Sequence, residues 1–232
     1  MAGAWVQDDT NVADATSTTI AKAFGSNVTA TNLIAVVAGC GGNQDATCAD
    51  SLTNTYTPKT ATYDAANDQK HFQWYAKNIA GGPCTVTVTF NATSKWRRLG
   101  IMEISGCDTA APDDGGAAQV QAGNSAADYY SSGNIITTVT DFVFGGWQDI
   151  DGSGSTLTAG ATPAFILREA DATKVIAMES RASQAAATFD ANFTSNVGWR
   201  AITSIMAFKE TAAGALSLPV ISETVSLAEA LD

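Results

Sequence analysis

The sequence has few of the side chains that usually carry catalysis or bind metals. Among its 232 residues there is one histidine, His71, and only 15% of the residues are charged. No Gly-x-Ser-x-Gly turn is present to hold a nucleophile, and no Cys-x-x-Cys pair has a histidine nearby to complete a zinc site. We therefore predict that the chain is not an enzyme and that it needs no metal or cofactor.

Basic residues and long apolar runs are also scarce. The chain has 12 Lys+Arg against 23 Asp+Glu, a net charge of -11, which repels phosphate backbones and anionic headgroups. We expect no nucleic-acid partner and no membrane partner, and no run of about twenty apolar residues could span a bilayer. The first residues lack a basic segment followed by an apolar one. This favours a virion or extracellular location, reached after signal removal or by release with a virus particle.

What is present is an alternation of apolar and polar residues, interrupted by clusters of Gly, Asn, Asp and Ser. This period of two predicts an all-β protein, an antiparallel two-sheet β-sandwich of jelly-roll type over residues 1–210, followed by a tail at 211–232. The runs 32–38 and 199–209 are apolar on both faces and predict central strands. The other expected strands are 19–24, 59–63, 71–79, 84–90, 97–105, 134–147, 155–159, 164–168, 175–180 and 186–189.

The four cysteines form an even set. Cys40 and Cys48 flank a Gly-rich loop, which makes a local disulfide easy. Cys84 opens one expected strand and Cys107 follows the next, so a hairpin turning near Ser94 would bring this second pair together. We predict these two disulfides. Four reduced, buried thiols are the alternative.

Two segments interrupt the strand pattern. Residues 105–132 form a long connection rich in Ala, Gly and Asp, which is typical of a crossover or a binding loop. The tail after Glu210 is apolar, and we expect a neighbouring subunit to cover it; packing on its own domain is the alternative. The tail residues expected to make this contact are Leu216, Leu218, Val220, Ile221, Val225 and Leu227.

One basic and aromatic group of residues stands out on this acidic chain. Trp96 lies at an expected hairpin tip, and two tyrosines lie on the long connection, where all of them could be exposed. Trp74 and Trp199 instead have the positions of core anchors. The predicted contact patch consists of Lys95, Trp96, Arg97, Tyr129 and Tyr130.

Acidic residues give weaker signals. Glu103 and Glu179 are the two carboxylates on expected strands, and we expect a buried carboxylate paired with an arginine there rather than an acid/base pair. Asp149 and Asp151 precede Gly152 as in the start of a calcium loop, but the distal glutamate of an EF-hand is missing, so an ordinary turn is favoured over calcium. His71 is expected to be a surface or half-buried residue of a sheet.

Several segments also carry a resemblance. The run Trp74-Tyr75-Ala76-Lys77-Asn78-Ile79-Ala80-Gly81-Gly82, followed by Thr85 to Phe90, together with Trp5-Val6-Gln7 and Met206-Ala207-Phe208, resembles uncharacterised β-rich proteins of bacterial and phage origin over residues 1–210. The tail 221–231 is similar to segments of phage structural proteins. The resemblance implies a sandwich and a virion component, and it carries over no catalytic or binding residue.

Three functions are compatible with these observations. The first is a phage virion structural protein, such as a capsid decoration, head-fibre or tail component, which forms a symmetric homo-oligomer or binds other virion proteins. The second is an extracellular carbohydrate-binding or adhesive module that binds surface glycans through Trp96 and the two tyrosines. The third is a glycoside-active enzyme using Glu103 and Glu179, whose carboxyl groups would have to share a cleft within about 10 Å.

Overall fold

The computed structural model describes residues 2–121, 128–149, 156–160, 164–173, 175–196 and 200–211. Within these ranges every regular element is a β-strand, and every paired strand is antiparallel. The all-β prediction is therefore confirmed. The strands form several sheets, none of which closes into a barrel. None of the described residues forms a helix long and apolar enough to cross a membrane.

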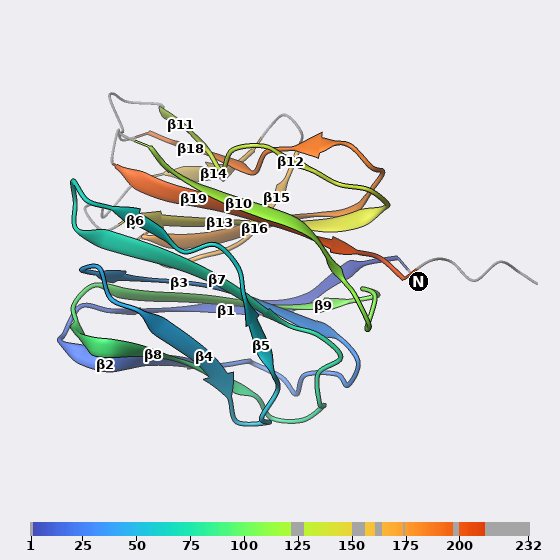
Figure 1. Cartoon of the computed structure of the whole chain (residues 1–232), viewed down its shortest axis with the longest axis horizontal. Coiled ribbons are helices and arrows are strands. Elements are labelled where there is room, and N and C mark those ends of the chain that lie inside the picture. Colours follow the sequence, from blue (N-terminus) through green and yellow to red (C-terminus); the bar gives the residue numbers. More distant parts are fainter. Residues whose placement is uncertain are drawn as a thin grey trace, which may run out of the picture.

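The sheets stack as four layers (Figure 1). The first layer has the order β2-β8-β4, and the second has the order β1-β9-β3-β7-β5, with β6 also paired to β7. The bounds of these strands are β1 Ala4–Ala13, β2 Ser17–Ala23, β3 Leu33–Gly41, β4 Ala46–Asp50, β5 Tyr56–Pro58, β6 Thr62–Asp64, β7 Gln69–Ala76, β8 Thr85–Ser94 and β9 Arg97–Ser105.

The second half of the chain builds the other two layers. The third layer has the order β10-β19-β13-β16-β15, and the fourth contains β11-β18-β14 and the pair β12-β17. Their bounds are β10 Asp113–Gln121, β11 Asp128–Ser131, β12 Ile135–Ile136, β13 Asp141–Asp149, β14 Leu157–Ala159, β15 Ile166–Ala170, β16 Ile176–Gln184, β17 Thr188–Phe189, β18 Asn192–Ser195 and β19 Ala201–Lys209. The described residues thus form five sheets where two were expected.

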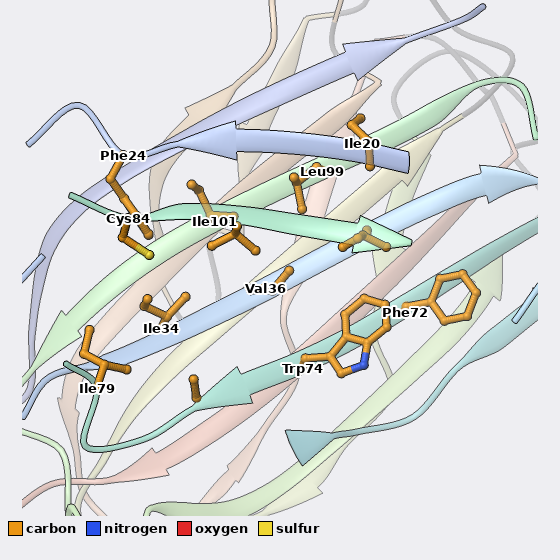
Figure 2. Close-up of a cluster of buried hydrophobic side chains, with 14 of the residues drawn as sticks. Ile20, Phe24, Ile34, Val36, Phe72, Trp74, Ile79, Cys84, Leu99 and Ile101 are labelled. Carbon is orange, nitrogen blue, oxygen red and sulfur yellow. The ribbon is translucent and has the colours of Figure 1, made fainter. Parts of the chain in front are cut away.

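Each space between layers has its own apolar core. The first core, between the first two layers, includes Val36, Trp74 and Ile101 (Figure 2). The second core lies between the two large sheets and includes Val37 and Met102. Further cores around Ile205 and Trp147 lie between the third and fourth layers. Because β3 and β9 contribute to the first two cores from opposite faces, both strands are apolar on both faces, as was predicted for β3.

The two halves of the chain have the same topology. Reading across the second and third layers, β1, β9, β3, β7 and β5 correspond to β10, β19, β13, β16 and β15, and in the outer layers β2, β8 and β4 correspond to β11, β18 and β14. The sequence repeats part of this pattern: Asn-x-Thr-Ser occurs at 91–94 and again at 192–195, each followed by Trp-Arg and then by Ile-Met.

The two large sheets also face each other symmetrically. Strand β1 lies against β15, β3 against β13, and β6 against β10. Val37 of β3 pairs with Gly100 of β9 and with Gln73 of β7. Gly146 of β13 occupies the equivalent position in the other large sheet, where it pairs with residues of β19 and β16, the strands that correspond to β9 and β7. A Cβ atom at Gly146 would lie 2.6 Å from Cγ1 of Val37, so these equivalent positions meet. The halves are therefore related by an approximate two-fold rotation, as in a symmetric dimer joined into one chain.

Several predicted elements differ from the observed ones. Strands β8 and β9 were expected to form a hairpin, but they lie in different layers, because the chain crosses from one sheet to the next at Trp96. The long connection predicted at 105–132 contains two strands, β10 and β11. Strand β1 was also missed. Both β1 and β10 are edge strands with few large apolar side chains, so their sequences lack the alternation that marks half-buried strands.

Candidate functional site

The tip between β8 and β9 exposes part of the predicted contact patch. Lys95 is exposed and Trp96 is 44% exposed, with the Trp96 backbone in the left-handed region at φ 50°. Gly41 lies under this tip, because its N–H donates to the Lys95 carbonyl at 2.9 Å and a Cβ atom there would lie 2.7 Å from the indole. The exposure predicted for Trp96 is therefore found, on a turn supported by β3.

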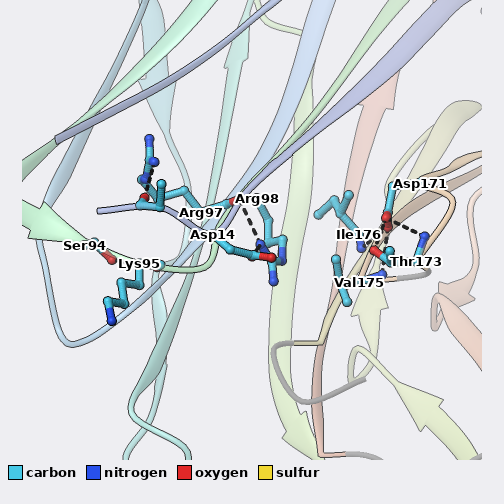
Figure 3. A network of polar contacts seen from close by, with 10 residues as sticks. Asp14, Ser94, Lys95, Arg97, Arg98, Asp171, Thr173, Val175 and Ile176 are labelled. Carbon is cyan, nitrogen blue, oxygen red and sulfur yellow. Dashed lines mark hydrogen bonds and ion pairs between the residues drawn. The ribbon is translucent and has the colours of Figure 1, made fainter. Parts of the chain in front are cut away.

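Arg97 does not belong to this exposed surface. It is only 5% exposed, and its guanidinium donates to the carbonyls of Thr19 and Ala15. The neighbouring Arg98 is also buried and donates from Nη1 to Asp14 Oδ1 at 2.7 Å (Figure 3). The two arginines fasten the start of β9 to the 14–16 segment, and Arg97 also holds Thr19 of β2. Arg97, predicted as part of the contact patch, is therefore a buried structural residue.

Tyr130 is the second departure from the predicted patch. It is fully buried in the fourth layer, where its ring meets Trp147 edge to face with the centroids 6.2 Å apart. The side chain of Tyr129 lies outside the described residues. Because β8 is in the first layer and β11 in the fourth, the structure does not bring Trp96 and Tyr130 together (Figure 1).

The four cysteines are free thiols, so the two predicted disulfides are absent. Cys84 lies in the first core and Cys107 in the second, on opposite sides of the second layer. The expected pairing assumed a β8–β9 hairpin that does not exist. The other predicted pair, Cys40 and Cys48, has different surroundings. The ionisable groups that act on the Cys48 thiol are Asp50 and Cys84, whereas those that act on the Cys40 thiol are Lys70 and Asp68. Burial raises the pKa of the Cys84 and Cys107 thiols to about 12, which keeps them protonated and unreactive.

His71 is the centre of a polar network that the sequence did not reveal. Its Nδ1 lies 2.9 Å from Gln148 Oε1, and its Nε2 lies 2.8 Å from Ser204 Oγ. The three side chains come from β7, β13 and β19, so the network joins the second and third layers. All three residues are fully buried, and burial lowers the pKa of His71 to about 4. His71 was expected at or near the surface, and that expectation is wrong.

This serine, histidine and glutamine arrangement has the order of a hydrolytic triad, in which the histidine accepts the serine proton and a third group orients the ring. A nucleophile must meet a substrate, but Ser204 Oγ is enclosed between two sheets. The Gly146 carbonyl oxygen, 3.3 Å away, is a second acceptor that shares the one hydroxyl proton of Ser204 with His71 Nε2. A neutral imidazole with both nitrogens bonded satisfies the polar groups that the interface buries. The arrangement therefore serves as an internal tie between the halves.

Glu103 and Glu179 lie on different sides of the second core. Glu103 accepts hydrogen bonds from Gln7, Thr29 and Asn32 at 2.6 to 2.7 Å. Glu179 accepts the N–H groups of Gly160 and Asn192 at 2.9 and 3.1 Å, next to the fourth layer. Stacked sheets lie about 10 Å apart, so two carboxyl groups on the outward faces of two stacked sheets cannot share a catalytic cleft.

Both glutamates are buried, as their strand positions predicted, but their hydrogen-bond partners are side-chain amides and backbone N–H groups instead of arginines. Burial raises the pKa of Glu179 to about 8, so this carboxyl is protonated at neutral pH. Glu103 joins β1, the 24–32 loop and β9, while Glu179 joins the third and fourth layers.

The proposed calcium residues are only partly described. Asp149 ends β13 in a fully buried position, where its N–H donates to the Val175 carbonyl at 3.0 Å. Asp151 lies outside the described residues, as do Trp199 and the predicted tail contacts at 216–227. Among the residues that the structure describes, no group of three or more His, Cys, Asp or Glu side chains is arranged to hold a metal ion.

One aromatic pocket was not predicted as a site. A pocket of about 250 Å³ lies between β4 and the edge of the second layer, next to Phe72 and Trp74. These rings stack with their centroids 5.4 Å apart (Figure 2). Lys59 and Asp45 also line the pocket. Both rings are largely buried, so Trp74 is a core anchor, as predicted.

Comparison with known proteins adds no identity: no family model, no curated protein and no solved structure matches this chain.

Proposed function

We propose that this chain is a non-enzymatic structural protein of a phage virion, a capsid decoration, head-fibre or tail component that assembles as a symmetric oligomer. The observation that carries the proposal is the use of the chemically capable side chains. His71, Glu103 and Glu179 are all enclosed, and each holds together segments or layers far apart in the sequence. Side chains used in this way build a rigid body and do not converge on a substrate.

The sequence supports the same proposal from another direction. The resemblance of residues 1–210 to phage and bacterial β-rich proteins, and of the tail to segments of phage structural proteins, favours a virion component. We further infer that each half of the body is a jelly-roll-like sandwich and that residues 211–232 extend from it as a tail. The acidic surface agrees with partners that are protein rather than nucleic acid or membrane.

Two measurements test this function. Light scattering on the full chain over a wide concentration range should give a defined multiple of the monomer mass, and a monomer at the highest concentration would overturn the proposal. The genes that flank the coding sequence should encode capsid or tail proteins. Flanking genes of a secretion or surface-adhesion system would instead favour an extracellular module.

The second candidate function is carbohydrate binding outside a virion. It is favoured by the exposed indole of Trp96 and by the pocket beside Phe72 and Trp74, because aromatic faces and edges pack against sugar rings. A glycan array should then give binding that Trp96→Ala abolishes. Trp5→Ala is the matched control, since Trp5 is exposed to a similar extent at 40%. Binding that survives Trp96→Ala removes this tip as the site.

A further inference from the structure

The edge formed by β1 and β15 exposes apolar side chains next to the start of the tail. Both strands are edge strands, of the second and third layers, and they lie against each other. Trp5 is 40% exposed, Val6 is 38% exposed and Ile166 is 56% exposed. We call these three residues the β1–β15 patch. Val6 is the extra residue of a bulge between Trp5 and Gln7.

The polar groups around the patch hold the Trp5 ring in place. The Arg168 guanidinium lies 5.0 Å from the indole centroid, and Trp5 Nε1 donates to Asp8 Oδ2 at 2.6 Å. Arg168 also donates from Nε to Ser180 Oγ at 2.7 Å. The indole is thus fixed by contacts from both layers, and a partner would meet an ordered aromatic surface at little cost in side-chain entropy.

The approximate two-fold symmetry supplies a comparison for this edge. On the opposite side of the stack β6, next to β5, lies beside β10; β5 corresponds to β15 and β10 to β1. There the two layers are joined by an ion pair, in which Lys59 Nζ lies 2.6 Å from Asp113 Oδ1. The two edges have the same topology but different surfaces. An ion pair joins the layers at the β6–β10 edge, whereas the β1–β15 edge exposes apolar side chains.

The described chain ends beside the apolar edge. The Thr211 N–H donates to the Gly106 carbonyl at 2.8 Å, and Glu210 lies against Gly3, two residues before Trp5. Beyond this point the sequence alternates Leu216, Leu218 and Val220 with Ser and Pro. Residues 212–232 could reach about 70 Å if extended, against a diameter of about 45 Å for a compact domain of this length. The tail is long enough to reach a second molecule.

We propose that residues 216–220 of one copy cover the β1–β15 patch of a second copy, reciprocally about a two-fold axis. The tail begins beside the patch. If a two-fold axis passes close to the tail start and the patch, the tail start of each copy lies next to the patch of its partner. The alternating apolar side chains of the tail then cover Trp5, Val6 and Ile166 of the other molecule. This inference rests on the proposed oligomeric function and names the surface that receives the tail.

The test uses paired variants of the full chain. Val6→Ser/Ile166→Ser changes the patch, at two exposed positions outside the buried cores, and Leu216→Ser/Leu218→Ser changes the tail. Each should raise the dissociation constant of the dimer at least about ten-fold in analytical ultracentrifugation. The matched control is Ile136→Ser/Val139→Ser, which removes two exposed apolar side chains on and just after β12 and should leave the dimer unchanged.

Mixing separates exchange between copies from docking within one copy. The patch variant keeps a normal tail and the tail variant keeps a normal patch, so a one-to-one mixture should form a mixed dimer with one intact contact. A monomeric mixture overturns exchange of tails. A wild-type oligomer that neither variant weakens overturns this docking surface and leaves the proposed function standing, whereas a wild-type monomer at all concentrations overturns both.

Discussion

At the scale of single residues, the buried titratable groups make stability depend on pH. Burial lowers the pKa of His71 to about 4, so the folded protein keeps the imidazole neutral down to that pH, whereas in the unfolded chain it titrates at its ordinary pKa of 6.5. As the pH falls through this window the unfolded chain takes up a proton and the folded protein does not. His71 therefore removes stability as the pH falls from about 6.5 to about 4, by roughly 3 kcal/mol in total.

We expect the difference in unfolding free energy between wild type and His71→Gln to depend on pH. At pH 7 the variant should be less stable because its bonds to Gln148 and Ser204 are poorer, and the gap in unfolding free energy should shrink as the pH falls to 4.5. Urea unfolding at several pH values measures it. A gap that is constant with pH would show that His71 is protonated in the folded protein, contrary to its enclosed position.

Glu179 has the opposite effect in a higher window. Burial raises its pKa in the folded protein to about 8 from the ordinary value of 4.5, so the folded protein keeps a proton that the unfolded chain releases. Its contribution is therefore largest at low pH and is lost as the pH rises through about 8. Glu179→Gln should be less stable by about 1–3 kcal/mol at pH 6, because one backbone N–H loses its acceptor.

Between pH 6 and 8.5 the wild type should lose more stability than Glu179→Gln. Urea unfolding of both proteins at matched pH checks this difference. Equal slopes would mean that the carboxyl is already ionised at pH 6, held by the N–H groups of Gly160 and Asn192.

At the scale of elements, the contact between β3 and β13 depends on a small residue. A Cβ atom at Gly146 would lie 2.6 Å from Val37 Cγ1 and 2.9 Å from Ser204 Oγ. Gly146→Ala should destabilise the protein by about 1–3 kcal/mol through overpacking. Adding Val37→Ala should make the double variant more stable than the sum of the single effects by at least about 0.5 kcal/mol. Thermal or urea unfolding of the four proteins measures the coupling.

Gly25→Ala is the matched control, because a Cβ atom at Gly25 meets nothing within 4 Å. It should change the unfolding free energy little. Additive effects of the Val37 and Gly146 changes would contradict direct packing of the two large sheets at this point.

Strand identity was easier to predict than strand partners. The apolar run of β3 predicted a central strand, and β3 lies between β9 and β7. The alternation of β8 was also recognised, yet its assignment to a hairpin with β9 was wrong. The alternation of apolar and polar residues indicates that a strand has two unlike faces, but it does not indicate which strand lies beside it. That choice depends on contacts between residues distant in the chain.

At the scale of the whole molecule, the two halves should remain associated without their connection. Ala110 and Ala111 are exposed in the segment between β9 and β10. After insertion of a protease site between them and cleavage, the two fragments should elute together in native buffer, held by the second core and the His71 network. Size-exclusion chromatography checks this, with denatured protein as the reference for separated fragments. Separation in native buffer would contradict a tightly packed interface between the large sheets.

For the candidate sites, as for the fold, the sequence predicted local features but not the contacts between distant segments. The sequence indicated an exposed Trp96, because a tryptophan between Lys95 and two arginines at a turn has no apolar neighbours along the chain. It could not show that Arg97 is buried, since the carbonyls of Thr19 and Ala15 that bind it belong to another segment. It likewise gave no sign of the His71 network, whose other two members, Gln148 and Ser204, lie 77 and 133 positions after the histidine.

The sequence by itself determined an all-β protein with central apolar strands, because period two and abundant turn residues are local properties of the chain. Only the tertiary structure decided that the strands form four stacked layers, that the halves are related by approximate two-fold symmetry, and that the cysteines stay unpaired. These outcomes depend on which apolar faces meet. Many faces in this chain are similar in polarity, so only packing in three dimensions selects among them.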